Sequence, residues 1–60
     1  MTRRQATRAV KNALACNLSH PEDSVFECIA ASAFYIFGFH DGLDCPEVGE
    51  QVYAVAQGWT

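Results

Sequence analysis

The chain has 60 residues, half of them apolar, and a formal net charge of −3 at pH 7. That length corresponds to one small domain, because so short a chain buries only about 60% of the surface that its unfolded form exposes. The longest apolar stretch, residues 28–39, is too short to cross a bilayer, and no secretory signal is recognisable. We therefore expect a soluble cytoplasmic protein that makes no membrane contact and whose three widely spaced cysteines are reduced thiols.

The first predicted helix covers residues 3–17. Thr2 and Gln5 have the spacing of a capping box, in which a side-chain hydroxyl and a side-chain amide satisfy free backbone N–H groups. The expected buried face repeats every three or four positions; it comprises Ala6, Ala9, Val10, Ala13 and Leu14.

The second predicted helix covers residues 20–40 and is the central one. Ser19 and Glu22 again match a capping box, with Pro21 in the first turn, and Gly38 or Gly42 is the expected end. Almost every position from Cys28 onward is apolar, which predicts a helix buried on most sides. Its main apolar stripe comprises Val25, Phe26, Ile29, Ala30, Ala33, Ile36 and Phe37.

The third predicted helix covers residues 45–57. Asp44 is the expected N-cap, Pro46 lies in the first turn, and Leu43 with Val48 has the spacing of a hydrophobic staple. The expected buried face comprises Val48, Val52, Val55 and Ala56. The fold class predicted from these elements is all-α, a compact three-helix bundle in one domain. A strand over residues 33–39 followed by an Asp-Gly hairpin turn is the alternative.

Candidate chemical sites are sparse. Cys16 with His20 and His40 with Cys45 resemble two halves of a zinc site, but they lack a tight cysteine pair, and the first half spans the break between two predicted helices. We expect no metal or cofactor, the cysteines being small core residues. No motif supplies a nucleophile with a base and an apolar cleft, so we expect no enzymatic activity.

The charged residues are segregated along the chain. The basic residues are Arg3, Arg4, Arg8 and Lys11, and the acidic residues are Glu22, Asp23, Glu27, Asp41, Asp44, Glu47 and Glu50. The basic stripe on the first helix is compatible with phosphate contacts, but the acids of the third helix would repel them, so direct nucleic-acid binding is not expected.

Antiparallel packing of successive helices would place Arg3 and Arg4 near the acids from Asp41 to Glu50, with Glu22, Asp23 and Glu27 at the opposite pole. Two interpretations stay open: the acids cap helices and pair with the basic residues, or they bind the basic surface of a partner. In the second interpretation the contact residues are all seven acids together with Tyr53 and Trp59 as exposed aromatics.

In its small size and its acidic charge, carried by those seven residues, the chain resembles the phage-encoded inhibitors called anti-CRISPR proteins. The resemblance implies a non-enzymatic protein that acts inside a bacterial host. Its carboxylates would imitate DNA phosphates and block DNA binding by a nucleic-acid-handling complex. The alternative from a different functional class is a homodimeric structural or regulatory module that uses apolar area of the second helix.

Overall fold

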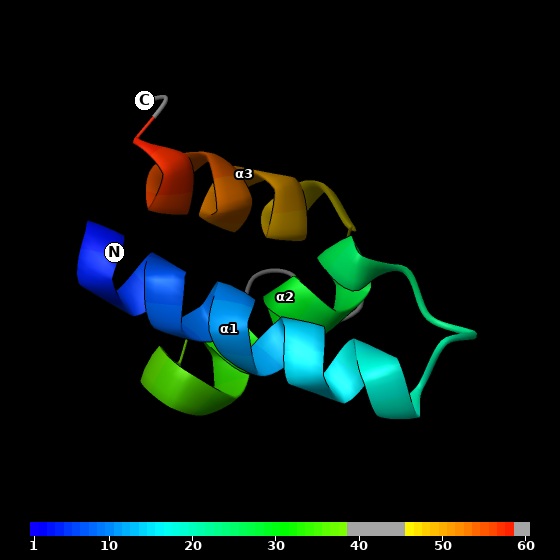
Figure 1. Ribbon diagram of the computed structural model, residues 1–60. Helices are drawn as coiled ribbons and strands as arrows, with labels where there is room; N and C mark the ends of the chain where they lie inside the picture. Colours follow the sequence, from blue (N-terminus) through cyan, green and yellow to red (C-terminus); the bar gives the residue numbers. More distant parts are fainter. Residues whose placement is uncertain (39–45, 59–60) are drawn as a thin grey trace.

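The chain folds into three helices, which the computed structural model describes over residues 1–38 and 46–58 (Figure 1). They are α1 (Arg3–Ser19), α2 (Val25–Phe37) and α3 (Pro46–Gln57), and each packs against the other two. The described residues contain no strand, and residues 33–37 belong to α2. The predicted all-α three-helix bundle is confirmed, and the strand alternative is wrong. The predictions for Gly42, Leu43 and Asp44 lie outside the described residues.

Helix α1 begins where its capping box predicts and ends two residues later than expected. The Thr2 hydroxyl accepts a hydrogen bond from the Gln5 backbone N–H at 3.1 Å, and the Thr2 N–H donates to Gln5 Oε1 at 2.8 Å. The helix then continues to Ser19. It stops there because His20 precedes Pro21, and a residue before proline avoids the helical region; His20 has φ −131° and ψ 66°.

Helix α2 begins five residues later than predicted. Ser24, not Ser19, is its N-cap: the Ser24 hydroxyl accepts a hydrogen bond from the Glu27 backbone N–H at 3.1 Å. The C-terminal end of α2 lies at Gly38, one of the two ends predicted from the sequence. Gly38 has φ 73°, a left-handed conformation suited to glycine, and its N–H donates to the Phe34 carbonyl at 2.9 Å.

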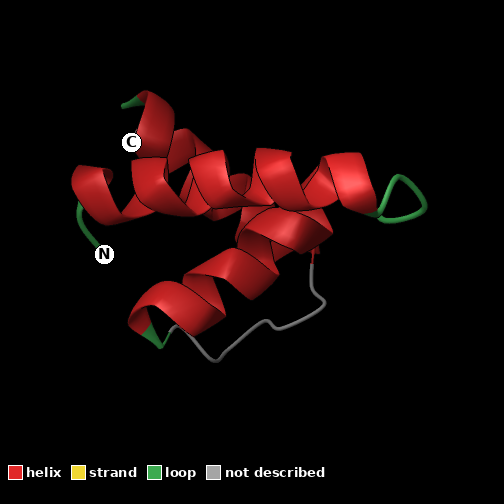
Figure 2. Cartoon of the chain, turned by 60° about the horizontal axis from the view of Figure 1, so that its bottom comes forward, coloured by secondary structure: helices red, strands yellow, loops and turns green. Residues whose placement is uncertain are grey.

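The core is built mainly from small side chains. The fully buried apolar side chains of α1 are all alanines, and the largest fully buried ones in the described residues are Ile29 and Val52. Small contact residues let helices approach closely, and α1 crosses α2 obliquely (Figure 2). The buried positions are Ala6, Ala9, Ala13, Cys28, Ile29, Ala30, Ala33, Val48, Gly49 and Val52.

Two expectations about burial are wrong. Leu14 is 55% exposed, because the α1 face that meets the other helices carries alanines and Leu14 projects beside it. Helix α2 is well buried only in its middle: Tyr35 is 79% exposed, and Phe34, Ile36 and Phe37 are half-buried. Two neighbouring helices are too few to enclose a third on every side.

Helix α3 runs antiparallel to α1. At the first turn of α3, Gly49 lies directly against the backbone of Phe26 in the first turn of α2. At the last turn of α3, the Arg3 side chain at the start of α1 donates from Nε to the Ala56 carbonyl at 3.3 Å. The first turns of α2 and α3 therefore lie side by side, and the start of α1 and the end of α3 lie together at the opposite end of the bundle (Figure 1).

Candidate functional site

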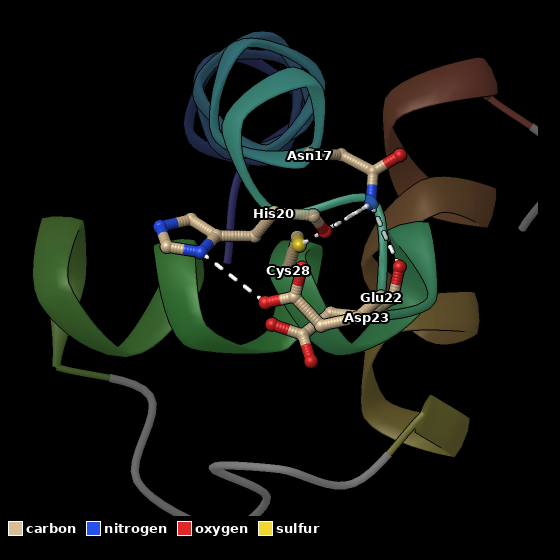
Figure 3. Close-up of polar contacts among 5 residues, drawn as sticks. All are labelled: Asn17, His20, Glu22, Asp23 and Cys28. Atoms are coloured by element: carbon tan, nitrogen blue, oxygen red, sulfur yellow. Dashed lines mark hydrogen bonds and ion pairs between the residues drawn. The ribbon is translucent and has the colours of Figure 1, made fainter.

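The Asn17 side-chain amide holds the turn between α1 and α2. Its Nδ2 donates to the backbone carbonyls of Asp23 at 2.8 Å and of His20 at 3.4 Å (Figure 3). The Asp23 backbone N–H in turn donates to the His20 carbonyl at 3.1 Å. These bonds fix the backbone that carries Glu22 and Asp23, two of the predicted partner-binding residues. This role of Asn17 was not predicted from the sequence, although asparagine is a typical turn-stabilising residue.

His20 and Glu22 face each other across the same turn. His20 Nδ1 lies 3.4 Å from Glu22 Oε2, and the two side chains are 57% and 66% exposed (Figure 3). The pair carries opposite charges only when the imidazole is protonated. An exposed pair of this kind contributes a fraction of a kcal/mol, so Glu22 stays available to solvent and to partners.

The structure brings two groups of predicted acids to one end of the bundle. Glu22, Asp23 and Glu27 surround the start of α2, and Glu47 and Glu50 belong to the first turns of α3, which lie beside it. We call these five residues the acidic end. The expectation that the two groups occupy opposite poles is wrong, because α3 starts beside the start of α2 and not beside its end.

The basic residues lie along the outer face of α1. Arg3, Arg4, Arg8 and Lys11, with Thr7, line a shallow surface groove, which we call the basic groove. The expected approach of Arg3 to Glu47 and Glu50 is wrong, since Arg3 reaches the last turn of α3 instead. A cation beside the free carbonyls of that turn is favourable to the helix dipole.

Most of the acidic end lacks a cationic partner in the part of the chain that the structure describes. Of Glu22, Asp23, Glu27 and Glu50, only Glu22 has an ion-pair partner within residues 1–38 and 46–58, and that partner is His20. Asp23 and Glu50 are exposed, and Glu27 is half-buried. Pairing with the basic residues of α1 therefore does not account for these carboxylates.

Of the two aromatic residues predicted to contact a partner, the structure describes only Tyr53. Tyr53 is half-buried, and its ring packs edge-to-face on Phe26, with the ring centroids 6.0 Å apart. It contributes to the contact between α2 and α3 and is not the exposed aromatic that was expected. Trp59, Asp41 and Asp44 lie outside the described residues.

The cysteines and histidines do not assemble a metal site in the described ranges. No group of three or more His, Cys, Asp or Glu side chains is placed to hold an ion within residues 1–38 and 46–58. Cys16 and His20 are both exposed at the end of α1. His40 and Cys45, the second half of the zinc set, lie outside those ranges.

The thiol of Cys28 lies in an apolar environment in the middle of the bundle. Burial raises the pKa of its thiol above the usual value, a neighbouring Cys16 thiol adds to the rise, and the Asn17 amide opposes it. The Asn17 Nδ2 lies 3.8 Å from Cys28 Sγ (Figure 3). A thiol with a raised pKa is protonated at neutral pH and is a weak nucleophile.

The chain has no match among protein-family models, curated proteins or solved structures. Within the described ranges, no helix has the length and apolar character that crossing a membrane requires. Function is therefore inferred from the surfaces of this chain alone.

Proposed function

We propose that this chain is a non-enzymatic interaction protein whose acidic end docks on the basic, nucleic-acid-binding surface of another protein complex. In keeping with the resemblance to anti-CRISPR proteins, it would act inside a bacterial cell as a stoichiometric inhibitor that excludes DNA from that surface. The observation that carries the proposal is the gathering of Glu22, Asp23, Glu27, Glu47 and Glu50 at one end of the bundle.

Helix capping explains only part of this gathering. Glu27 and Glu47 occupy the first turns of α2 and α3, where a carboxylate stabilises the free N–H groups of the helix. Glu22 and Asp23 precede the α2 cap, and Glu50 lies beyond the first turn of α3. These three carboxylates do not stabilise a helix N-terminus, so their position supports a role in binding a partner.

The charge layout favours a basic protein surface as the partner. A compact cluster of carboxylates attracts cations over about a Debye length, roughly 8 Å at physiological ionic strength, and speeds association with a surface of opposite charge. The same cluster repels nucleic acid. The basic groove on the outer face of α1 is lined by other residues and is distinct from this cluster.

The proposal is tested by competition for DNA. A purified RNA-guided DNA-binding effector complex is titrated with a labelled target duplex, with and without the chain, at several salt concentrations. We expect the wild-type chain to lower DNA binding at low salt and to lose this effect as salt rises. Reversing Glu22, Asp23 and Glu50 to lysine should abolish the effect while helical content, followed by circular dichroism, stays constant.

A matched control replaces Arg4, Arg8 and Lys11 by glutamine, which removes three charges from the basic groove. This variant should inhibit as well as the wild type. An unaltered inhibition by the acid-reversed variant, or a loss of inhibition in the control alone, would assign the binding to another surface. A wild-type chain that leaves DNA binding unchanged at every salt concentration would contradict the inhibitor function.

A second candidate function is homodimerisation through apolar side chains of α2. Tyr35 is 79% exposed and packs edge-to-face with Phe34, their ring centroids 5.2 Å apart, which leaves an aromatic surface on the outer side of the helix. Sedimentation equilibrium separates the two functions. An apolar dimer persists at high salt and is weakened by Tyr35→Ser, whereas a monomer at all concentrations removes this candidate.

A further inference from the structure

The basic groove on the outer face of α1 is lined by four cationic side chains and one threonine, and no acidic residue is among them. Its volume of about 480 Å³ is in the range of small-molecule sites. Arg4, Arg8 and Lys11 follow one another at spacings of four and three residues, so their side chains lie on the same side of the helix. All three are exposed, and none has an ion-pair partner within residues 1–38 and 46–58.

The other two residues of the groove have hydrogen bonds of their own. Arg3 Nε donates to the Ala56 carbonyl at 3.3 Å, which anchors the guanidinium against the last turn of α3. Its two terminal nitrogens have no hydrogen bond in the part of the chain that the structure describes. The Thr7 hydroxyl donates to the Arg3 carbonyl at 2.8 Å and therefore has no proton to offer a ligand. The groove thus presents cationic N–H donors, which suit the oxygen atoms of a phosphate group.

The crowding of these cations is unfavourable to the free chain. Like charges three or four residues apart on a helix repel each other. Arg4 also lies in the first turn of α1, which contains no acidic residue, so its charge is close to the positive end of the helix dipole. An anion bound in the groove would reduce both effects. Its binding would therefore stabilise the folded chain.

We propose that the basic groove binds a compact polyphosphate group, such as the phosphate chain of a nucleoside triphosphate. A multivalent anion contacts several cations at once, whereas a chloride ion contacts one or two. Arg3 and Lys11 are eight residues apart and span about 12 Å of helix, so a short anion fits the row of cations. The net charge of −3 opposes a long polyanion, such as nucleic acid, that extends beyond the groove. The site does not depend on the proposed inhibitor function, which uses the acidic end.

The test titrates the full chain with inorganic tripolyphosphate, pyrophosphate and phosphate at one fixed ionic strength. Isothermal titration calorimetry gives the affinity and the stoichiometry, and backbone amide chemical shifts in NMR spectra locate the site. We expect one tripolyphosphate per chain, weaker binding of pyrophosphate and weaker still of phosphate, and shift changes concentrated in residues 3–11. The melting temperature should rise with tripolyphosphate and not with sodium chloride of equal ionic strength.

Two double variants test whether the charges of the groove carry the binding. Arg4→Gln with Arg8→Gln should weaken tripolyphosphate binding about tenfold, because two exposed charge contacts are lost. The matched control, Arg4→Lys with Arg8→Lys, keeps both charges and should weaken binding far less. Both positions are exposed, so we expect helical content, followed by circular dichroism, to stay constant in both variants.

Several outcomes would overturn the proposal. They are the absence of saturable binding, equal affinity for the three anions, shift changes outside α1, and equal binding by the wild type and the glutamine variant. Tighter binding of a DNA duplex than of tripolyphosphate would also overturn it, and would assign the groove to nucleic acid. The shift map and the order of the three affinities in the wild type decide the question even if a variant fails to fold.

Discussion

The backbones of α2 and α3 are in close contact at Gly49, a residue without a side chain. A Cβ at Gly49 would overlap the carbonyl group of Phe26, and that neighbour is backbone, which cannot rotate away. We expect Gly49→Ala to separate the two helices and to lower the free energy of unfolding by about 3 kcal/mol, the upper range for overpacking. Urea denaturation followed by circular dichroism measures the change.

Gly38→Ala is the matched control for this substitution. Gly38 has φ 73°, and a Cβ there meets no atom within 4 Å, so the cost is the left-handed conformation alone, about 1 kcal/mol. The proximity of Gly49 to Phe26 predicts that the Gly49 variant is clearly the less stable of the two. Equal losses would mean that α2 and α3 are not in contact at this position.

Because the Cys28 thiol is buried, the free energy of unfolding should depend on pH in the alkaline range. Its pKa in the folded chain is raised above the usual value of 9.0, so above about pH 9 the unfolded state releases this proton more readily than the folded state. The Cys28 thiol makes its full contribution to the free energy of unfolding below that pH. This contribution decreases as the pH rises toward the pKa of the thiol in the folded chain. The free energy of unfolding, measured in a reducing agent between pH 7 and 10, should fall more steeply for the wild type than for Cys28→Ala. Parallel pH profiles would show that the thiol is solvated.

At the level of the helices, two serines compete as the start of α2. Ser24 is the observed cap, and its hydroxyl bonds the Glu27 N–H, whereas Ser19 is the last residue of α1. We expect Ser24→Ala to lower the free energy of unfolding by about 1 kcal/mol, the usual loss for an N-cap. Ser19→Ala should change it by less than about 0.5 kcal/mol, as at other exposed sites. A larger loss for Ser19→Ala than for Ser24→Ala, in thermal or urea unfolding, would support Ser19 as the cap, as predicted from the sequence.

These serines also show why the sequence misplaced the start of α2. Ser19 and Ser24 are each followed three residues later by a glutamate, so both match the same capping pattern. The choice is made by Asn17, whose amide binds the carbonyls of His20 and Asp23 and so keeps residues 20–23 in a turn. That contact joins residues six apart through a side chain, and helical periodicity carries no information about it.

The buried face of α1 was predicted correctly where the pattern is made of alanine and wrongly where it is made of leucine. Ala6, Ala9 and Ala13 are fully buried, but Leu14 is 55% exposed. Hydrophobic scoring assigns a leucine to the core before an alanine. Here the small side chains are the ones that allow close helix contact, so shape decides and hydrophobicity alone misleads.

At the scale of the whole molecule, the element types could be predicted and the direction of α3 could not. Antiparallel packing of successive helices predicted that α3 starts near the end of α2. A helix of 13 residues is about 20 Å long, and the eight residues from 38 to 45 reach up to roughly 27 Å, so either end of α2 is accessible to the next helix. The close contact of Gly49 with Phe26 shows that α3 starts beside the first turn of α2. The acidic residues of these two helices therefore share one end of the bundle.

The gathering of charge at that end predicts a salt-dependent cost in stability. Asp23 and Glu50 lie outside the first helical turns and have no cationic partner in the described ranges, so each adds repulsion to the acidic end. We expect the double variant Asp23→Asn, Glu50→Gln to raise the free energy of unfolding by about 0.5 kcal/mol at low ionic strength. The gain should disappear in 1 M salt, where the Debye length falls to about 3 Å.

The matched control for this prediction exchanges the same two residues without changing charge, as Asp23→Glu with Glu50→Asp. It should show no salt-dependent gain in urea denaturation. A loss of stability on neutralisation at low salt would mean that these carboxylates have cationic partners, and the acidic end would then have less free charge to offer. A gain that vanishes with salt has the opposite meaning: the fold tolerates a repulsion that docking on a basic surface would relieve.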